Sequence, residues 1–142
     1  MLYGIGCDLC EVARMEKSLS GAHSPAFVRR VFGPAEQAAL GLGAEAEHWP
    51  AGRASAHKAA SAAADFAAKE AFLKAAGTGL AAPFSLCEIE AVRLPSGAPN
   101  YRFSGKTAEW VAAHHLTAKL SLSHDGGMAL AFCTLEQLPP ET

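Results

Sequence analysis

The chain has 142 residues, which suits a single domain, because domains usually hold roughly 100–200 residues. Half of the residues are apolar and 18% are charged, a balance that excludes a disordered or fibrous protein. No apolar stretch approaches the ~20 residues of a membrane span, and a formal net charge of −2 provides no general basic field for nucleic acid. We therefore expect one domain over residues 1–142 that neither crosses a membrane nor binds nucleic acid.

Residues 2–9 predict a short strand with one nearly bare side. Large side chains alternate there with Gly4, Gly6 and Asp8, so another element can approach the backbone closely. Asp8 is the only large polar group on the bare side. The N-terminal sequence lacks the basic region and long apolar core of a signal peptide. This favours a cytoplasmic protein whose cysteines stay reduced.

Helices are expected through the next part of the chain. An apolar stripe at i, i+3 and i+7 begins with Val12. Cap and proline signals start two further helices at Ser24 and Pro34. The longest uninterrupted segment has no Gly or Pro, is rich in Ala, and ends at Gly77. The predicted ranges are 24–32 and 34–40 for the short helices, 41–53 for a loop, and 54–76 for a long helix.

The remaining sequence has the two-residue period of strands. We expect strands over 86–94, 100–103, 119–124 and 128–135, with a helix over 106–116 and turns at 96–99 and 125–127. One strand, several helices and then mostly strands predict an α+β fold, not alternating βαβ units.

Glu70 is the most unusual residue of the predicted long helix. It lies on the inward stripe with Phe66 and Leu73, where a carboxylate is costly unless it is paired. One interpretation is a helical ion pair with Lys74 at the edge of the core. The other is a carboxylate that shares a hard cation with Asp8, because two carboxylates plus substrate phosphates commonly hold Mg²⁺.

Three other patterns have both an ordinary and a functional interpretation. His124 ends a strand at a tight turn, as satisfied polar residues and catalytic residues both do, and the lack of Gly-x-Ser-x-Gly argues against a serine hydrolase. Cys7 and Cys10 match C-x-x-C, but strand parity sends them to opposite faces, so we expect buried apolar cysteines. The early basic residues form either a solvated helix face or a surface for an acidic partner; they are Arg14, Lys17, Arg29 and Arg30.

Five motifs in order resemble the holo-acyl-carrier-protein synthases, the small bacterial 4′-phosphopantetheinyl transferases. They are residues 4–9 with Glu11 and Arg14, residues 27–32 leading to Glu36, residues 66–79, residues 97–99, and residues 121–124. The resemblance implies a small α+β fold with a mainly antiparallel sheet packed against a long helix. It implies homotrimers with active sites between subunits, and a role in fatty acid biosynthesis.

By this resemblance, the enzyme transfers the 4′-phosphopantetheine group of coenzyme A to a serine of apo acyl carrier protein and releases adenosine 3′,5′-bisphosphate. Asp8 and Glu70 would hold Mg²⁺ against the pyrophosphate. Glu70, directly or through water, would take the proton of the attacking serine. Lys74 would bind the coenzyme and stabilise or protonate the leaving phosphate.

Further residues are assigned only by the same resemblance. Gly97, Pro99 and His124 match positions that line the coenzyme A site. Arg14 and Arg30 match the surface that meets an acidic helix of the carrier protein, where charge steers association.

Two departures from the family pattern affect the coenzyme A site. Asp65 stands where Arg usually precedes Phe66, as though residues 54–65 were inserted after Arg53, and Ala98 stands where Lys is common. Twelve helical residues would displace Arg53 by ~18 Å. We expect weaker coenzyme A binding than is typical, with the metal site intact. The alternatives are a Mg²⁺-dependent phosphohydrolase and a non-catalytic carrier-binding module.

Overall fold

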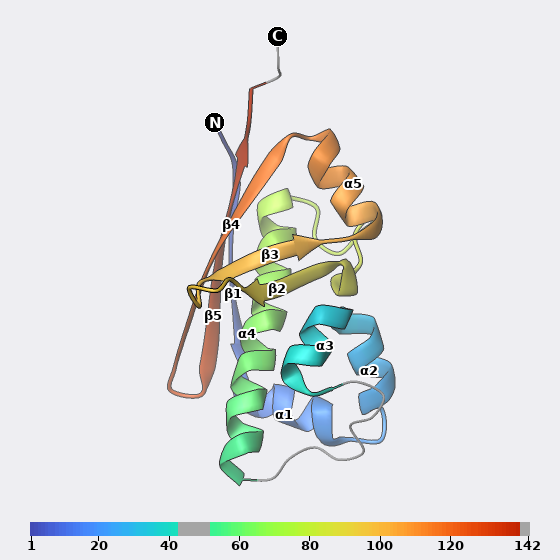
Figure 1. Ribbon diagram of the computed structural model, residues 1–142, viewed down its shortest axis with the longest axis vertical. Helices are drawn as coiled ribbons and strands as arrows, with labels where there is room; N and C mark the ends of the chain where they lie inside the picture. The colour runs from blue at the N-terminus through green and yellow to red at the C-terminus, as the bar shows by residue number, and fades with distance from the viewer. Residues whose placement is uncertain (43–51, 140–142) are drawn as a thin grey trace.

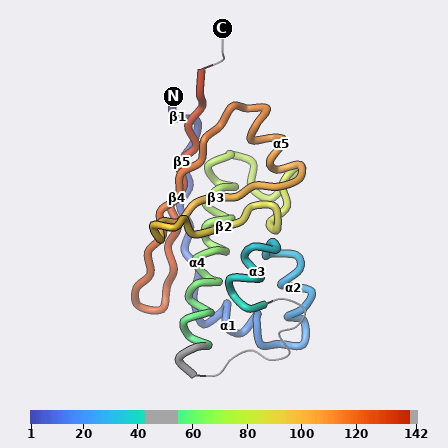
Figure 2. Tube along the Cα trace, viewed as in Figure 1, coloured from blue at the N-terminus to red at the C-terminus, as the bar shows by residue number. Residues whose placement is uncertain are grey.

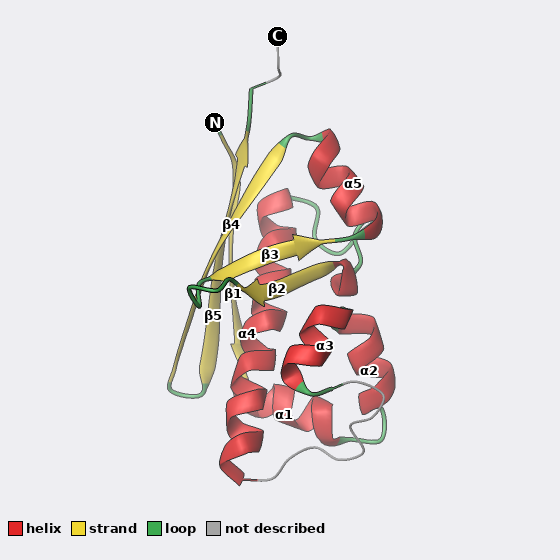
Figure 3. Ribbon diagram, viewed as in Figure 1, coloured by secondary structure: helices red, strands yellow, loops and turns green. Residues whose placement is uncertain are grey.

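The computed structural model describes residues 1–42 and 52–139, and Figures 1 and 3 show its helices and strands. The elements are β1 (Leu2–Glu11), α1 (Val12–Ser20), α2 (Ser24–Val31), α3 (Pro34–Leu40), α4 (Gly52–Ala76), the 3₁₀ turn η1 (Leu86–Glu88), β2 (Ile89–Arg93), β3 (Pro99–Phe103), α5 (Gly105–Ala113), β4 (Leu116–Asp125) and β5 (Met128–Gln137). The predicted α+β class is confirmed. No helix of these described ranges is long and apolar enough to cross a membrane.

The main sheet has three antiparallel strands in the order β1-β5-β4. β1 and β4 are therefore its two edges, and the chain ends run side by side where β1 pairs with β5 (Figure 2). Across β5, Asp8 pairs with Ala131 and His124 with Ala129. Alternate residues of β5, from Ala129 to Leu135, are buried beneath α4, which packs on β1 and β5.

The bare side of β1 allows α4 to lie against its backbone. A Cβ atom at Gly4 would overlap the backbone carbonyl of Ala75, and one at Gly6 would overlap that of Ala71. Alanines on the facing side of α4 are fully buried. Small residues on both elements thus bring the strand and the helix into direct backbone contact, as the alternation of residues 2–9 predicts.

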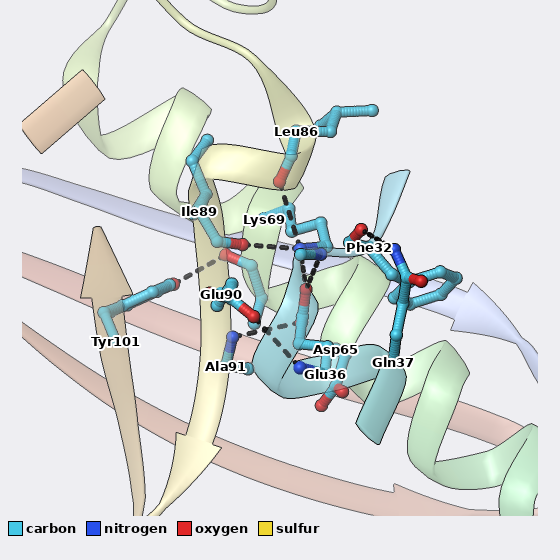
Figure 4. Close-up of polar contacts among 12 residues, drawn as sticks. Phe32, Glu36, Gln37, Asp65, Lys69, Leu86, Ile89, Glu90, Ala91 and Tyr101 are labelled. Carbon is cyan, nitrogen blue, oxygen red and sulfur yellow. Dashed lines mark hydrogen bonds and ion pairs between the residues drawn. The ribbon is translucent and has the colours of Figure 1, made fainter. Parts of the chain in front are cut away.

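A buried ion pair joins α3, α4 and β2 (Figure 4). The ammonium group of Lys69 on α4 donates to a carboxylate oxygen of Glu36 and to the backbone carbonyls of Leu86 and Ile89. Glu36 also accepts hydrogen bonds from the backbone N–H groups of Gly33 and Ala91. Burial raises the pKa of Glu36, and the charge of Lys69 opposes that shift. The pair therefore fixes α3 and β2 to the long helix.

Several predicted boundaries differ from the structure. Residues 86–88 form a 3₁₀ turn before the strand begins at Ile89. The helix predicted to end at Leu116 stops at Ala113, because His115 adopts a left-handed φ of 53° and Leu116 already belongs to β4. The long helix begins at Gly52, two residues before the predicted Ala54. Most of the predicted loop over 41–53 lies outside the described residues.

The outer face of the main sheet, on the side away from α4, carries exposed apolar side chains. Ile5 and Leu9 on β1 are 56% and 59% exposed, and Phe132 on β5 is 42% exposed. Cys7 pairs with Phe132 on this face and is exposed. The expectation of a buried Cys7 is therefore wrong, because no element within residues 1–42 and 52–139 covers the outward side of β1. Cys10 faces the other way and is partly buried, as strand parity predicts.

Candidate active site

Asp8, Glu70 and Lys74 meet where β1 crosses α4. Asp8 points to the α4 side of β1, and the Lys74 ammonium donates to its Oδ1 at 3.1 Å and to the Cys7 carbonyl at 2.9 Å. Glu70 lies one helical turn before Lys74. In the described part of the chain Lys74 pairs with Asp8 and not with Glu70. The site thus joins side chains that are 66 residues apart in sequence, those of Asp8 and Lys74.

The electrostatics of this cluster suit proton transfer. Burial raises the pKa of Glu70, the negative charge of Asp8 raises it further, and Lys74 acts in the opposite direction. A carboxylate with a raised pKa is a better general base than a free glutamate. The Lys74 side chain is 56% exposed, so its charge is accessible to an anionic substrate.

The two carboxylates also have the right chemistry for a hard cation. Asp8 and Glu70 offer oxygen ligands, and both lie at the edge of solvent. Within residues 1–42 and 52–139, no group of three or more His, Cys, Asp or Glu side chains gathers. A pair of carboxylates completed by substrate phosphates and water is a common Mg²⁺ arrangement, so the residues fit the predicted metal.

A cavity separate from this cluster contains the other residues expected to bind coenzyme A. Its volume is about 280 Å³, and Gly97, Pro99 and His124 line it together. Lys74, which was also expected to contact the coenzyme, is not among the residues that line this cavity. His57 and Arg93 do line it, and the sequence analysis missed both.

The helical side of this cavity has a periodicity that could have been found in the sequence. His57, Ala60, Ser61 and Ala64 lie at i, i+3, i+4 and i+7 on α4 and face the cavity together. Only His57 and Ser61 of these four are polar, and their spacing of four residues on an alanine-rich helix is visible in the sequence. Arg93 offered no such local signal, because its position depends on where β2 crosses α4.

The two parts of the expected site lie on opposite edges of the main sheet. Asp8 is on β1 and His124 is on β4, with β5 between them. Both point to the face that α4 covers, and α4 packs on β1 and β5. In a single chain, the carboxylate cluster and the His124 cavity are therefore separated by the width of the sheet.

Arg14 and Arg30 lie on one surface, along α1 and α2. A cavity of about 190 Å³ is lined by Arg14 and Phe27, and one of about 430 Å³ is lined by Lys17, Phe27 and Arg30. Because Phe27 borders both, the two cavities are adjacent. This surface, the α1–α2 groove, combines an apolar floor with a basic rim.

Residues 54–65 form regular turns of α4 and do not loop out. Asp65 is buried, and its Oδ1 lies 3.9 Å from Nη2 of Arg93. The side chain of Arg53 lies outside the described residues, so the predicted displacement of that group is not tested. The structure instead places an arginine from β2 beside the position where the family pattern has a helical arginine.

The model of the 4′-phosphopantetheinyl transferase superfamily matches residues 4–133. The chain belongs to this superfamily. It is 40% identical over 147 aligned residues to a holo-[acyl-carrier-protein] synthase of Methylobacterium sp. (strain 4-46), covering 100% of this chain and 99% of the relative. The predicted family and the predicted transferase class are thereby confirmed.

Solved structures support the same relationship. The chain is similar to the holo-[acyl-carrier-protein] synthase of Neisseria meningitidis, with a TM-score of 0.77, 27% identity, and coverage of 96% of this chain and 100% of that chain. It is also similar to the Bacillus anthracis synthase in complex with CoA (3′,5′-ADP), with a TM-score of 0.71, 29% identity, and coverage of 97% and 99%. The superfamily fold thus extends over nearly the whole chain. The roles of individual residues stay predictions.

Proposed function

We propose that this transferase moves the 4′-phosphopantetheine group of coenzyme A to a serine of an apo acyl carrier protein, in a Mg²⁺-dependent reaction that releases adenosine 3′,5′-bisphosphate. The observation that carries this proposal is the cluster of Asp8, Glu70 and Lys74 at the β1–α4 crossing. The named activity of the Methylobacterium relative and the coenzyme in the Bacillus anthracis structure support it.

The chemistry follows from the positions of the side chains. Glu70 accepts the proton of the serine hydroxyl, whose oxygen attacks the phosphorus attached to pantetheine. The bond from that phosphorus to the bridging oxygen of the pyrophosphate breaks, and the electron pair leaves with adenosine 3′,5′-bisphosphate. Lys74 neutralises or protonates the leaving phosphate. Mg²⁺ bound by Asp8 and Glu70 would supply charge neutralisation at the pyrophosphate.

The α1–α2 groove is the proposed docking surface for the carrier protein. Arg14 and Arg30 border it, and both are exposed. A basic rim around Phe27 complements an acidic, amphipathic helix. The groove begins at the residues that follow β1, so a carrier docked there would present its serine near Asp8.

We also propose a homotrimer with shared sites. Asp8 and His124 lie on opposite edges of one sheet, so a ring in which the β1 edge of one copy meets the β4 edge of the next would unite the two parts of the site. Heterologous contacts of this kind form a ring when the rotation between copies closes after three. The outer sheet face would turn toward the axis, which would cover Ile5, Leu9 and Phe132. The cytoplasmic location and the role in fatty acid biosynthesis stay predictions.

The deciding experiment is the intact mass of an apo acyl carrier protein after incubation with coenzyme A, with Mg²⁺ or with a chelator. We expect a Mg²⁺-dependent gain of one phosphopantetheine group, which Asp8→Asn and Glu70→Gln abolish. Glu109→Gln on the exposed side of α5 is the control and leaves the gain unchanged. Coenzyme A cleavage without a mass gain would instead indicate a phosphohydrolase, and carrier binding without cleavage would indicate a non-catalytic module.

A further inference from the structure

The cavity of about 280 Å³ that holds His124 has the chemistry of an anion site. His57, Arg93 and His124 line it, and no carboxylate of the described part of the chain does. Its volume is at the lower end of ligand pockets, so it suits one part of a nucleotide, such as a ribose phosphate. Coenzyme A carries a phosphate of that kind on its 3′ oxygen.

We propose that Arg93, with His57, recognises the 3′-phosphate of coenzyme A, and that Asp65 positions Arg93 for this contact. The inference rests on the proposed function, because it takes coenzyme A as the donor. It assigns recognition of the nucleotide part of coenzyme A to an arginine on β2. Arg93 and His57 would thus offset part of the charge missing at Asp65 and Ala98.

The geometry around Arg93 leaves its guanidinium available. Arg93 is the last residue of β2, and its side chain is 43% exposed, whereas that of Asp65 is 7% exposed. The two groups are 3.9 Å apart, which is too long for a hydrogen bond. Asp65 therefore lies beside the guanidinium on the α4 side without occupying its N–H donors. Those donors suit bidentate binding of a phosphate.

The protonation of Asp65 supports this division of roles. Burial raises its pKa to about 8, with Glu36 and Glu90 acting in the same direction and Arg93 and Lys69 opposing them. At neutral pH most Asp65 groups therefore carry a proton. The positive charge of Arg93 is then left for a ligand.

Arg102 provides a matched comparison on the neighbouring strand. It lies with Arg93 on a cavity of about 610 Å³ between α3, α4 and β2, but it does not line the cavity that holds His57 and His124. It is exposed, as Arg93 is. Removing Arg102 thus deletes a similar charge without touching the proposed phosphate contact.

The test compares coenzyme A with 3′-dephospho-coenzyme A as donors to an apo acyl carrier protein. For Arg93→Ala we expect kcat/KM for coenzyme A to fall about 10- to 100-fold through KM, as for loss of a charge-assisted hydrogen bond, while the value for the dephospho donor is unchanged. For His57→Ala we expect the same selectivity with a smaller loss of kcat/KM for coenzyme A. Arg102→Ala should leave kcat/KM unchanged for both donors. Because Arg93→Ala leaves Asp65 without its partner, the double variant Arg93→Ala/Asp65→Asn is measured beside it.

Asp65→Ala tests the positioning role. We expect a several-fold rise in KM for coenzyme A alone, whereas a merely structural residue would affect both donors equally. Equal effects on the two donors, or no effect of Arg93→Ala and its double variant, would overturn the inference. Failure of the proposed function looks different, because the unaltered protein would then transfer nothing from either donor.

Discussion

Asp65 makes stability depend on pH. Its pKa is raised by burial to about 8 in the folded chain, whereas an unfolded aspartate titrates near 3.9. Between about pH 4 and 8 the folded state therefore binds more protons than the unfolded state, and stability falls as pH rises. The slope from this one group approaches about 1.4 kcal/mol per pH unit.

Asp65→Asn removes the part of the pH dependence of stability that comes from Asp65. We expect the free energy of unfolding, measured by urea titration from pH 5 to 9, to fall less steeply with pH in the variant than in the unaltered protein. The variant gains stability relative to the unaltered protein toward pH 8. Parallel curves for the two proteins would show that Asp65 is ionised throughout this range.

Lys69 is a second residue whose effect on the free energy of unfolding depends on its partners. Lys69→Met would leave Glu36 buried without its counter-charge and two carbonyls without a donor. Loss of one partner of a buried ion pair costs about 3–5 kcal/mol, and urea unfolding measures it. Lys69→Met/Glu36→Gln should recover a large part of the loss, since neither position then carries an unpaired buried charge. A double variant no more stable than the single one would contradict this account.

At the scale of elements, the contact between β1 and α4 holds Asp8 beside Glu70 and Lys74. Gly6→Ala would place a methyl group on the carbonyl of Ala71, so strand and helix must separate. We expect a loss of at least about 1–3 kcal/mol in unfolding free energy. Transfer activity should fall as well, because Asp8 moves from Lys74. Gly21→Ala is the control for stability, since a Cβ there meets its nearest atom at 3.7 Å and should leave the unfolding free energy unchanged.

The contact between β1 and α4 also shows which parts of the candidate site could be predicted from the sequence. Alternation along β1 and the helical stripe through Glu70 are local patterns, and each correctly points its carboxylate inward. Their meeting was predictable because Gly4 and Gly6 indicate close packing of another element. Arg93 and the Lys69–Glu36 pair depend instead on where β2 and α3 dock on α4. No spacing within one segment encodes those long-range positions.

At the scale of the whole molecule, assembly and activity should fail together. Phe132→Glu places a charge on the outer sheet face, where the proposed trimer buries an apolar side chain. We expect monomers in sedimentation equilibrium and loss of transfer, because each site of the proposed trimer would need residues from two copies. Leu138→Glu, at an exposed apolar residue just beyond β5, is the control. An active monomer would contradict shared sites.

The α1–α2 groove should act mainly on the rate of encounter. Arg14→Glu reverses a charge on its rim, and we expect kcat/KM for the carrier protein to fall on the order of tenfold at low salt. The difference should shrink as salt rises, because screening weakens steering. Arg102→Glu serves as the control. Unchanged kinetics with the carrier would place the docking surface elsewhere.

The outward position of Cys7 gives the protein a built-in reporter of its own assembly. Its thiol is exposed in the single chain and lies opposite Phe132, on the face that the trimer would enclose. Cys133, on the inner side of the same sheet, is buried within each chain. Alkylation of Cys7 should therefore slow as copies associate while Cys133 stays protected throughout. The ratio of the two labels, located by mass spectrometry, would follow association in the unaltered sequence.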